Sequence, residues 1–247
     1  MDIQELQHIY ASHPNTLGLA KQLENSSVRT IFLGGLHASA SPLFFSSFLN
    51  NLSHSVVFVL GDAEEAGYFY HDLVQMMGDE RVLFYPSTFR RAVKYAQRDA
   101  ANEILRTEVL GRLSRGNACY IVTHPAALSE RVASVQDYRS GMIALAEGEA
   151  HDLAELTRRL LDMGFRRCDY VYEPGEFAVR GSILDVYSFS SEMPFRIDFF
   201  GDDIDSIRTF EVQTQLSKER KTEVTVVPDV EEGASTLVPF TECLPAE

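Results

Sequence analysis

The sequence predicts an α/β protein, with a doubly wound parallel-sheet domain and a small inserted α+β domain built from antiparallel hairpins. Two observations support this prediction. Over the first 127 residues, short continuous apolar runs alternate with segments of helical periodicity, which is typical of a parallel sheet covered on both faces. From about residue 150, glycine turns and alternating apolar and polar residues replace that pattern, which is typical of hairpins.

The strands expected in the first domain are the apolar runs at 29–34, 55–60, 82–85 and 119–122. A helix is predicted over 62–77 because Asp62 is a good N-cap, Glu65 follows three residues later, and Gly78 is a good stop. A second helix is predicted from about 98 to 115, ending at Gly116. Alternation of strands and helices indicates βαβ units.

The loop after the first expected strand is where such a sheet binds a phosphate. An active P-loop reads G-x-x-x-x-G-K-[ST], in which the lysine reaches the phosphates and the hydroxyl binds magnesium. Here the stretch starts at Gly35, and Ala40, Ser41 and Pro42 replace the second glycine, the lysine and the hydroxyl residue. Proline also removes a backbone donor. This sequence therefore predicts a degenerate P-loop or a plain strand–loop–helix connection.

The composition limits the possible functions. With 22 Lys+Arg and 36 Asp+Glu, the chain has a formal net charge of −14, which argues against a nucleic-acid-coating protein and a polybasic membrane anchor. Neither a long apolar run nor a signal peptide is present, so a cytoplasmic protein is expected. The three cysteines and seven histidines are scattered without metal-ligand spacing, so no metal site or cofactor is expected.

Charge is unevenly distributed along the chain. Residues 128–214 carry 9 basic and 17 acidic side chains, yet they contain the pairs Arg158-Arg159 and Arg166-Arg167. Residues 81–115 carry 8 basic and 3 acidic side chains, so this segment is either the solvated face of a long helix or a residual nucleic-acid contact. These contrasts suggest separate functional surfaces.

The second domain is expected to begin with a helix from Asp152 to just before Gly164. Strands are predicted at 176–180 and 183–187, with a bulge at Gly181 or Ser182 because the apolar register shifts there. The further expected strands are 195–200, 204–212 after a turn at 201–203, and 224–227.

Two runs in this domain carry a resemblance to known families. The segments 175–187 and 195–208, together with Thr214-Gln215, resemble the small inserted domain shared by the excinuclease subunit UvrB and the transcription-repair coupling factor (Mfd). The similarity spans about 150–217 and extends more loosely over the α/β block. Because UvrB-like proteins resemble active P-loop ATPases at the loop that is degenerate here, the chain looks more like the N-terminal module of the coupling factor.

The resemblance implies an organisation and a partner. It implies a RecA/helicase-like domain over 1–127, a UvrA-binding domain over 128–214, and a segment 215–247 that returns to the first domain and whose residues 215–228 pack with it. In both families the inserted domain binds UvrA. Arg167 and Arg180 match arginines implicated in that contact.

The other residues expected near the UvrA contact match the family pattern less directly. Arg166 is an exchangeable neighbour of Arg167, and a third arginine of the pattern falls on Ala178. Phe165 and Phe177 are either anchors for the partner or core residues. The alternative role for the arginines is a solvated face with ion pairs inside the domain to Asp162, Asp169 or Glu176.

The leading functional hypothesis is a non-catalytic module that recruits UvrA to sites of stalled transcription. The resemblance implies that the longer family members are ATP-dependent DNA translocases that reach RNA polymerase and DNA through domains outside these 247 residues. The alternative is a nucleotide-binding fragment of a UvrB-type subunit. A Rossmann-like enzyme is disfavoured because the sequence lacks G-x-G-x-x-G and a recognisable nucleophile–base pair.

Overall fold

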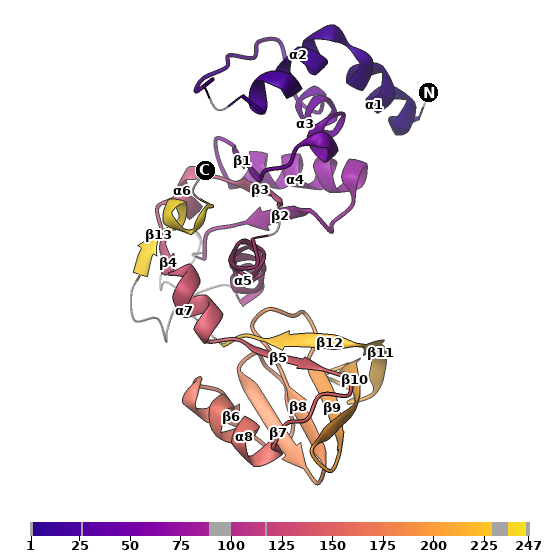
Figure 1. Ribbon diagram of the computed structural model, residues 1–247, viewed down its shortest axis with the longest axis vertical. Coiled ribbons are helices and arrows are strands. Elements are labelled where there is room, and N and C mark those ends of the chain that lie inside the picture. Colours follow the sequence, from indigo (N-terminus) through magenta and orange to yellow (C-terminus); the bar gives the residue numbers. More distant parts are fainter. Residues whose placement is uncertain (1, 26, 89–99, 117, 229–236, 246–247) are drawn as a thin grey trace. The chain divides into compact units, whose positions relative to one another are not determined.

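The computed structural model describes residues 2–25, 27–88, 100–116, 118–228 and 237–245 (Figure 1). The chain forms two compact units. The first combines Met1–Ser87 with Gly116–Ser129, and the second combines Thr88–Arg115 with Glu130–Glu247. This division differs from the boundary expected between residues 127 and 128, because the segment that contains the helix after residue 99 joins the second unit.

A parallel sheet with strand order β1-β3-β2 forms the first unit's centre. Its strands are β1 (Val56–Val59), β2 (Val82–Tyr85) and β3 (Tyr120–Thr123), which confirms three of the four expected strands. Helix α4 (Ala63–Met77) begins after Asp62, whose carboxylate accepts hydrogen bonds from the N–H groups of Glu64 and Glu65, and ends at Gly78. The α4 prediction is confirmed together with its cap and stop.

The strand expected at 29–34 is wrong. These residues pair with no strand in the described part of the chain, and Phe32 is 92% exposed. Ile31 and Leu33 are also exposed, so the run contributes little to a core. The described parallel sheet therefore has three strands, and a doubly wound sheet with a phosphate loop after its first strand stays a prediction.

Helices from the N-terminal region complete the core of the first unit. They are α1 (Ile3–Ser12), α2 (Pro14–Leu23), α3 (Ala40–Ser46) and the short 3₁₀ segment η1 (Leu49–Asn51), and α6 (Pro125–Leu128) follows the last strand. Leu19, Phe44, Phe48 and Leu73 pack there with Tyr120 of β3. Helices α1 and α2 were not predicted.

The second unit begins with a helical part. Helix α5 (Ala100–Ser114) confirms the described portion of the helix expected at 98–115, and it packs with α7 (Val135–Ser140). The buried Tyr138 hydroxyl donates a 2.7 Å hydrogen bond to the Thr107 carbonyl, which ties α7 to α5. Strand β4 (Arg131–Ala133) pairs with β13 (Leu237–Pro239), which leads into η2 (Phe240–Cys243).

A six-stranded sheet dominates the rest of the second unit. Its strands, in pairing order, are β6 (Arg166–Arg167), β7 (Glu176–Arg180), β8 (Ile183–Val186), β9 (Phe195–Phe200), β10 (Asp203–Phe210) and β11 (Ser217–Lys221). All neighbours are antiparallel except β6 and β7. The bulge expected at Gly181 or Ser182 is wrong, because these residues form the two-residue turn that joins Arg180 to its partner Ile183.

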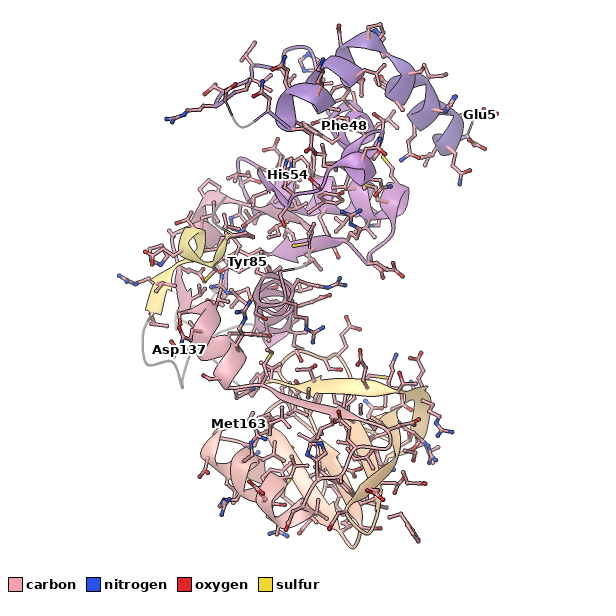
Figure 2. All side chains as sticks on the ribbon, in the orientation of Figure 1. Glu5, Phe48, His54, Tyr85, Asp137 and Met163 are labelled. Carbon is pink, nitrogen blue, oxygen red and sulfur yellow. The ribbon has the colours of Figure 1, made fainter. Side chains whose placement is uncertain are left out.

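One face of this sheet packs against helix α8 (Leu153–Asp162), which begins at Asp152 as expected. The pair β5 (Ile143–Ala146) and β12 (Glu223–Val226) joins the same core, and Figure 1 shows these two strands running crosswise to the longer ones. Met163, labelled in Figure 2, follows α8 and also packs there. Strand β12 was expected to pack with the first domain, but it pairs instead with β5.

Candidate partner-binding site

The six-stranded sheet has two chemically different faces. Successive side chains of a strand point to opposite faces. In β7, Phe177 and Val179 belong to the core under α8, whereas Glu176, Ala178 and Arg180 lie on the opposite face. We call that opposite face the outer face.

A buried carboxylate organises the centre of the outer face. Asp185 is fully buried, and its two oxygens accept from Nε and Nη2 of Arg196 at 2.7 and 2.8 Å. Arg180 forms a second ion pair with the same carboxylate. Arg196 also lies over the ring of Phe210 at 4.5 Å and donates to the Gln215 carbonyl at 3.0 Å. The hydrogen bond from Arg196 to Asp185 raises the pKa of the guanidinium above its ordinary value.

A second buried carboxylate lies at the start of β7. One oxygen of Glu176 accepts from the backbone N–H groups of Tyr172 and Glu173 at 2.8 and 3.1 Å, and the other oxygen pairs with Arg166. Burial by itself raises the pKa of this carboxyl, but the two backbone donors and Arg166 outweigh burial and hold the pKa below its ordinary value. Glu176 is therefore an ionised acceptor that joins a loop to an arginine.

The structure brings two of the three expected arginines to one face. Arg166 is the register partner of Glu176 and shares its side of the sheet with Arg180, whereas Arg167 is the register partner of Phe177 and belongs to the opposite side. Among the described residues Arg167 is exposed and forms no ion pair. Arg166 does pair with Glu176, as the alternative interpretation expected.

Two other expected site residues and the position of the absent third arginine are buried. Phe165 and Phe177 are only 3% and 0% exposed and belong to the core under α8, so neither ring presents a surface to a partner. Ala178, the position of the third arginine in the family pattern, is 1% exposed and packs in a small cluster with Val171 and Phe210. That position faces packed side chains here rather than solvent.

The sequence reasoning missed two residues of the outer face. Asp185 interrupts the otherwise apolar strand β8, and a charged residue in such a strand is a signal that a partner must be nearby. Tyr170 was not singled out either, although the Arg180 guanidinium lies over its ring, 5.1 Å from the centroid. Both residues gain their importance from contacts between strands and loops.

The stretch from Gly35 to Pro42 uses part of its backbone hydrogen-bonding capacity locally. The N–H groups of Ala40 and Ser41 donate to the carbonyls of His37 and Ala38, both at 3.1 Å, and Pro42 has no N–H group. Two backbone donors at the end of this stretch are thus used locally, and a third is missing. Gly35 does adopt a left-handed conformation, with φ of 85°.

Other candidate sites are less informative. No group of three or more potential metal ligands occurs among the residues that the structure describes.

Within the basic segment 81–115, Arg106 is buried and pairs with Glu130 at 3.1 Å, which is a structural role. The cations at 90, 91, 94 and 98 lie outside the described residues. Within the described ranges, no helix combines the length and apolar character needed to cross a membrane.

The comparisons with known proteins agree with this architecture. Residues 143–231, which contain the outer face, match the UvrB interaction domain family. The chain is also similar to transcription-repair-coupling factors. The identity is 31% over 196 residues to that of Bacillus subtilis, 32% over 201 residues to that of Myxococcus xanthus, and 35% over 103 residues to that of Haemophilus influenzae.

These similarities cover 79%, 78% and 42% of this chain. The chain spans 17%, 17% and 9% of the three relatives, so it corresponds to a small part of each. The resemblance seen in the sequence is confirmed: the chain is similar to transcription-repair-coupling factors over most of its length, and its residues 143–231 match the UvrB interaction domain family.

Proposed function

We propose that this chain is a docking module that recruits UvrA, the damage-recognition subunit of nucleotide excision repair, to sites of stalled transcription in the cytoplasm. The observation that carries the proposal is the outer face of a UvrB interaction domain, where Arg166 and Arg180 are each held by a buried carboxylate. The module acts without catalysis of its own and without a cofactor.

The chemistry of the outer face suits an acidic partner. A guanidinium has more N–H donors than its ion pair uses, so Arg166 and Arg180 retain donors for carboxylates of a partner. Because Glu176 and Asp185 restrict the two side chains beforehand, less rotamer entropy is lost on binding. The surrounding domain is acidic, so an acidic partner is attracted at Arg166 and Arg180 and repelled by most of the remaining surface. This charge pattern gives the proposed contact with UvrA its specificity.

The proposal is tested by measuring the affinity of purified UvrA for the chain and for the double variant Arg166→Ala/Arg180→Ala. We expect the double variant to bind more weakly by about tenfold or more, since arginines are frequent hot spots of interfaces. The matched control is Arg158→Ala/Arg159→Ala on α8, where Arg158 is 71% exposed and forms only a surface pair with Glu155. Equal binding by the parent and the outer-face variant would contradict the proposal.

We also propose that Gly35–Pro42 is the degenerate P-loop of a RecA/helicase-like first domain and binds no nucleotide. The locally used N–H groups of Ala40 and Ser41 support this assignment. Titration of magnesium-ATP into the chain is expected to give no heat of binding. A binding isotherm would instead favour the UvrB-type nucleotide-binding subunit. In the whole protein, contacts with RNA polymerase and DNA and any translocase activity would belong to other regions.

A further inference from the structure

Residues 168–175 connect β6 to β7, and we call residues 169–175 the tyrosine loop. Tyr170 and Tyr172 are 50% and 55% exposed, whereas Val171 between them is completely buried. Val171 packs with Ala178 and Phe210 in the small cluster on the outer face. The loop therefore points two large rings toward solvent and fixes itself to the sheet through the residue between them.

Three further contacts hold this loop in one conformation. The Glu176 carboxylate accepts from the N–H groups of Tyr172 and Glu173, and the Gln215 side-chain amide donates to the Val171 carbonyl at 3.3 Å. Gly175 ends the loop with φ of 86°, where an added Cβ would lie 2.9 Å from the ring of Phe189. A loop that is ordered before binding presents its rings at a small entropic cost.

The tyrosine loop is continuous with the two arginines of the outer face. Arg180 lies over the ring of Tyr170, and Arg166 shares the Glu176 carboxylate with the backbone of Tyr172. Tyrosine and arginine are among the residue types that are enriched at the energetic centres of protein interfaces. The ring of Phe200 is also exposed, but within the described part of the chain it has no arginine surface around it of the kind that the tyrosine loop has. It lies close to Asp202 and Asp203, whose carboxylates would repel an acidic partner.

We propose that the tyrosine loop is the second half of the docking surface, and this inference rests on the proposed function. Its occupant is a segment of UvrA in which carboxylates that bind Arg166 and Arg180 flank apolar side chains that pack on Tyr170 and Tyr172. Glu176 is a positioning residue, because it orders both Arg166 and the loop without facing the partner itself.

The first test changes only the exposed rings and measures UvrA affinity. Tyr170→Ala and Tyr172→Ala are each expected to weaken binding by about tenfold, whereas Tyr170→Phe, which keeps the ring, should bind within about twofold of the parent. Phe200→Ala is the matched control and should leave the affinity unchanged.

The outcomes separate this inference from the proposed function. If neither the parent chain nor any variant binds UvrA, the proposed function fails. If the parent binds and Arg166→Ala/Arg180→Ala does not, while both tyrosine-to-alanine variants bind as the parent does, the docking function stands and the role of the loop is refuted.

The positioning role of Glu176 is tested with Glu176→Gln, alone and combined with Tyr170→Ala/Tyr172→Ala. If Glu176 acts by ordering the loop, Glu176→Gln weakens UvrA binding by about tenfold in the parent and by clearly less in the tyrosine-free background, since coupled residues are not additive. Faster hydrogen exchange at the Tyr172 and Glu173 amides should accompany the loss. An equal effect in both backgrounds, or none, would overturn the positioning role. Should Glu176→Gln not fold, the surface variants still decide the loop's role.

Discussion

The two faces of the six-stranded sheet are built from the same strands but are stabilised by different interactions. On the face under α8, Phe177, Leu184 and Ile197 are completely buried and apolar. On the outer face, the equally buried residues include the charged Asp185, which is held between Arg180 and Arg196. Because side chains alternate along each strand, one sequence supplies an apolar core on one face and paired charges on the other.

Burial of apolar side chains and burial of ion pairs contribute differently to the stability of the fold. Burying an apolar side chain removes its surface from water and stabilises the fold by roughly 1.5–3 kcal/mol for a large side chain. A buried ion pair gains little net stability because desolvation offsets the attraction. We therefore interpret the charges of the outer face as devices that position surface side chains, and the predictions below test that division.

The largest effect on stability is expected from the face under α8. Phe177→Ala removes a ring that is completely buried and leaves a cavity among the residues of β8, β9 and α8. We expect a loss of about 4 kcal/mol in the free energy of unfolding. Urea denaturation followed by far-UV circular dichroism measures it. A loss below about 1 kcal/mol would show that this face is loosely packed.

A somewhat smaller effect is expected from Asp185→Ala on the outer face. The change leaves Arg180 and Arg196 without their shared carboxylate, and we expect a loss of about 2–3 kcal/mol because both arginines retain some contact with water. The control is Asp198→Ala, since Asp198 is 3.9 Å from the exposed Arg208 and such pairs contribute under about 1 kcal/mol. Equal losses of unfolding free energy for the two variants would show that the buried carboxylate of Asp185 contributes no more than an exposed ion pair.

The next prediction concerns the pH dependence of the outer face. The pKa of Glu176 is lower in the folded chain than its ordinary value, so the ionised carboxylate stabilises the fold above the unfolded pKa, and this contribution is lost as the pH falls through the folded pKa. The difference in unfolding free energy between the parent and Glu176→Gln should therefore shrink as the pH is lowered from about 6 to about 3. A difference independent of pH would show that the ionised carboxylate is not the stabilising species.

Much of the sheet could be predicted because its signals are local. Caps such as Asp152 and the alternation in 176–180 each act over a few residues, and the structure bears them out. The turn expected at 201–203 is present but shorter, because Asp203 already pairs with Phe200 as the first residue of β10. The run at 29–34 has the composition of a strand but finds no neighbouring strand in the described part of the chain, and pairing is not encoded in the run itself. At Gly181-Ser182 the apolar register shifts, and a two-residue turn produces the same shift as a bulge.

The site was less predictable because its contacts are not local. Arg166 and Arg167 form a strand of two residues, too short for any alternation to assign a face to each. The pair between Asp185 and Arg196 joins residues of different strands, and Tyr170 becomes part of the surface only through Arg180. The resemblance indicated which residue types matter, whereas register decides which of them share a face.

The smallest expected effect is also the sharpest test of that register. Arg167 is exposed and, within the described residues, makes no ion pair, so Arg167→Ala should change the free energy of unfolding by less than about 0.5 kcal/mol. For UvrA binding, Arg166→Ala should then cost more than Arg167→Ala, since only Arg166 shares the outer face with Arg180 and the tyrosine loop. Affinity measurements on the two single variants, with Arg159→Ala as the control, make the comparison. Should Arg167→Ala weaken binding as much as Arg166→Ala, UvrA must reach around the edge of β6, and recognition would not be confined to one face of the sheet.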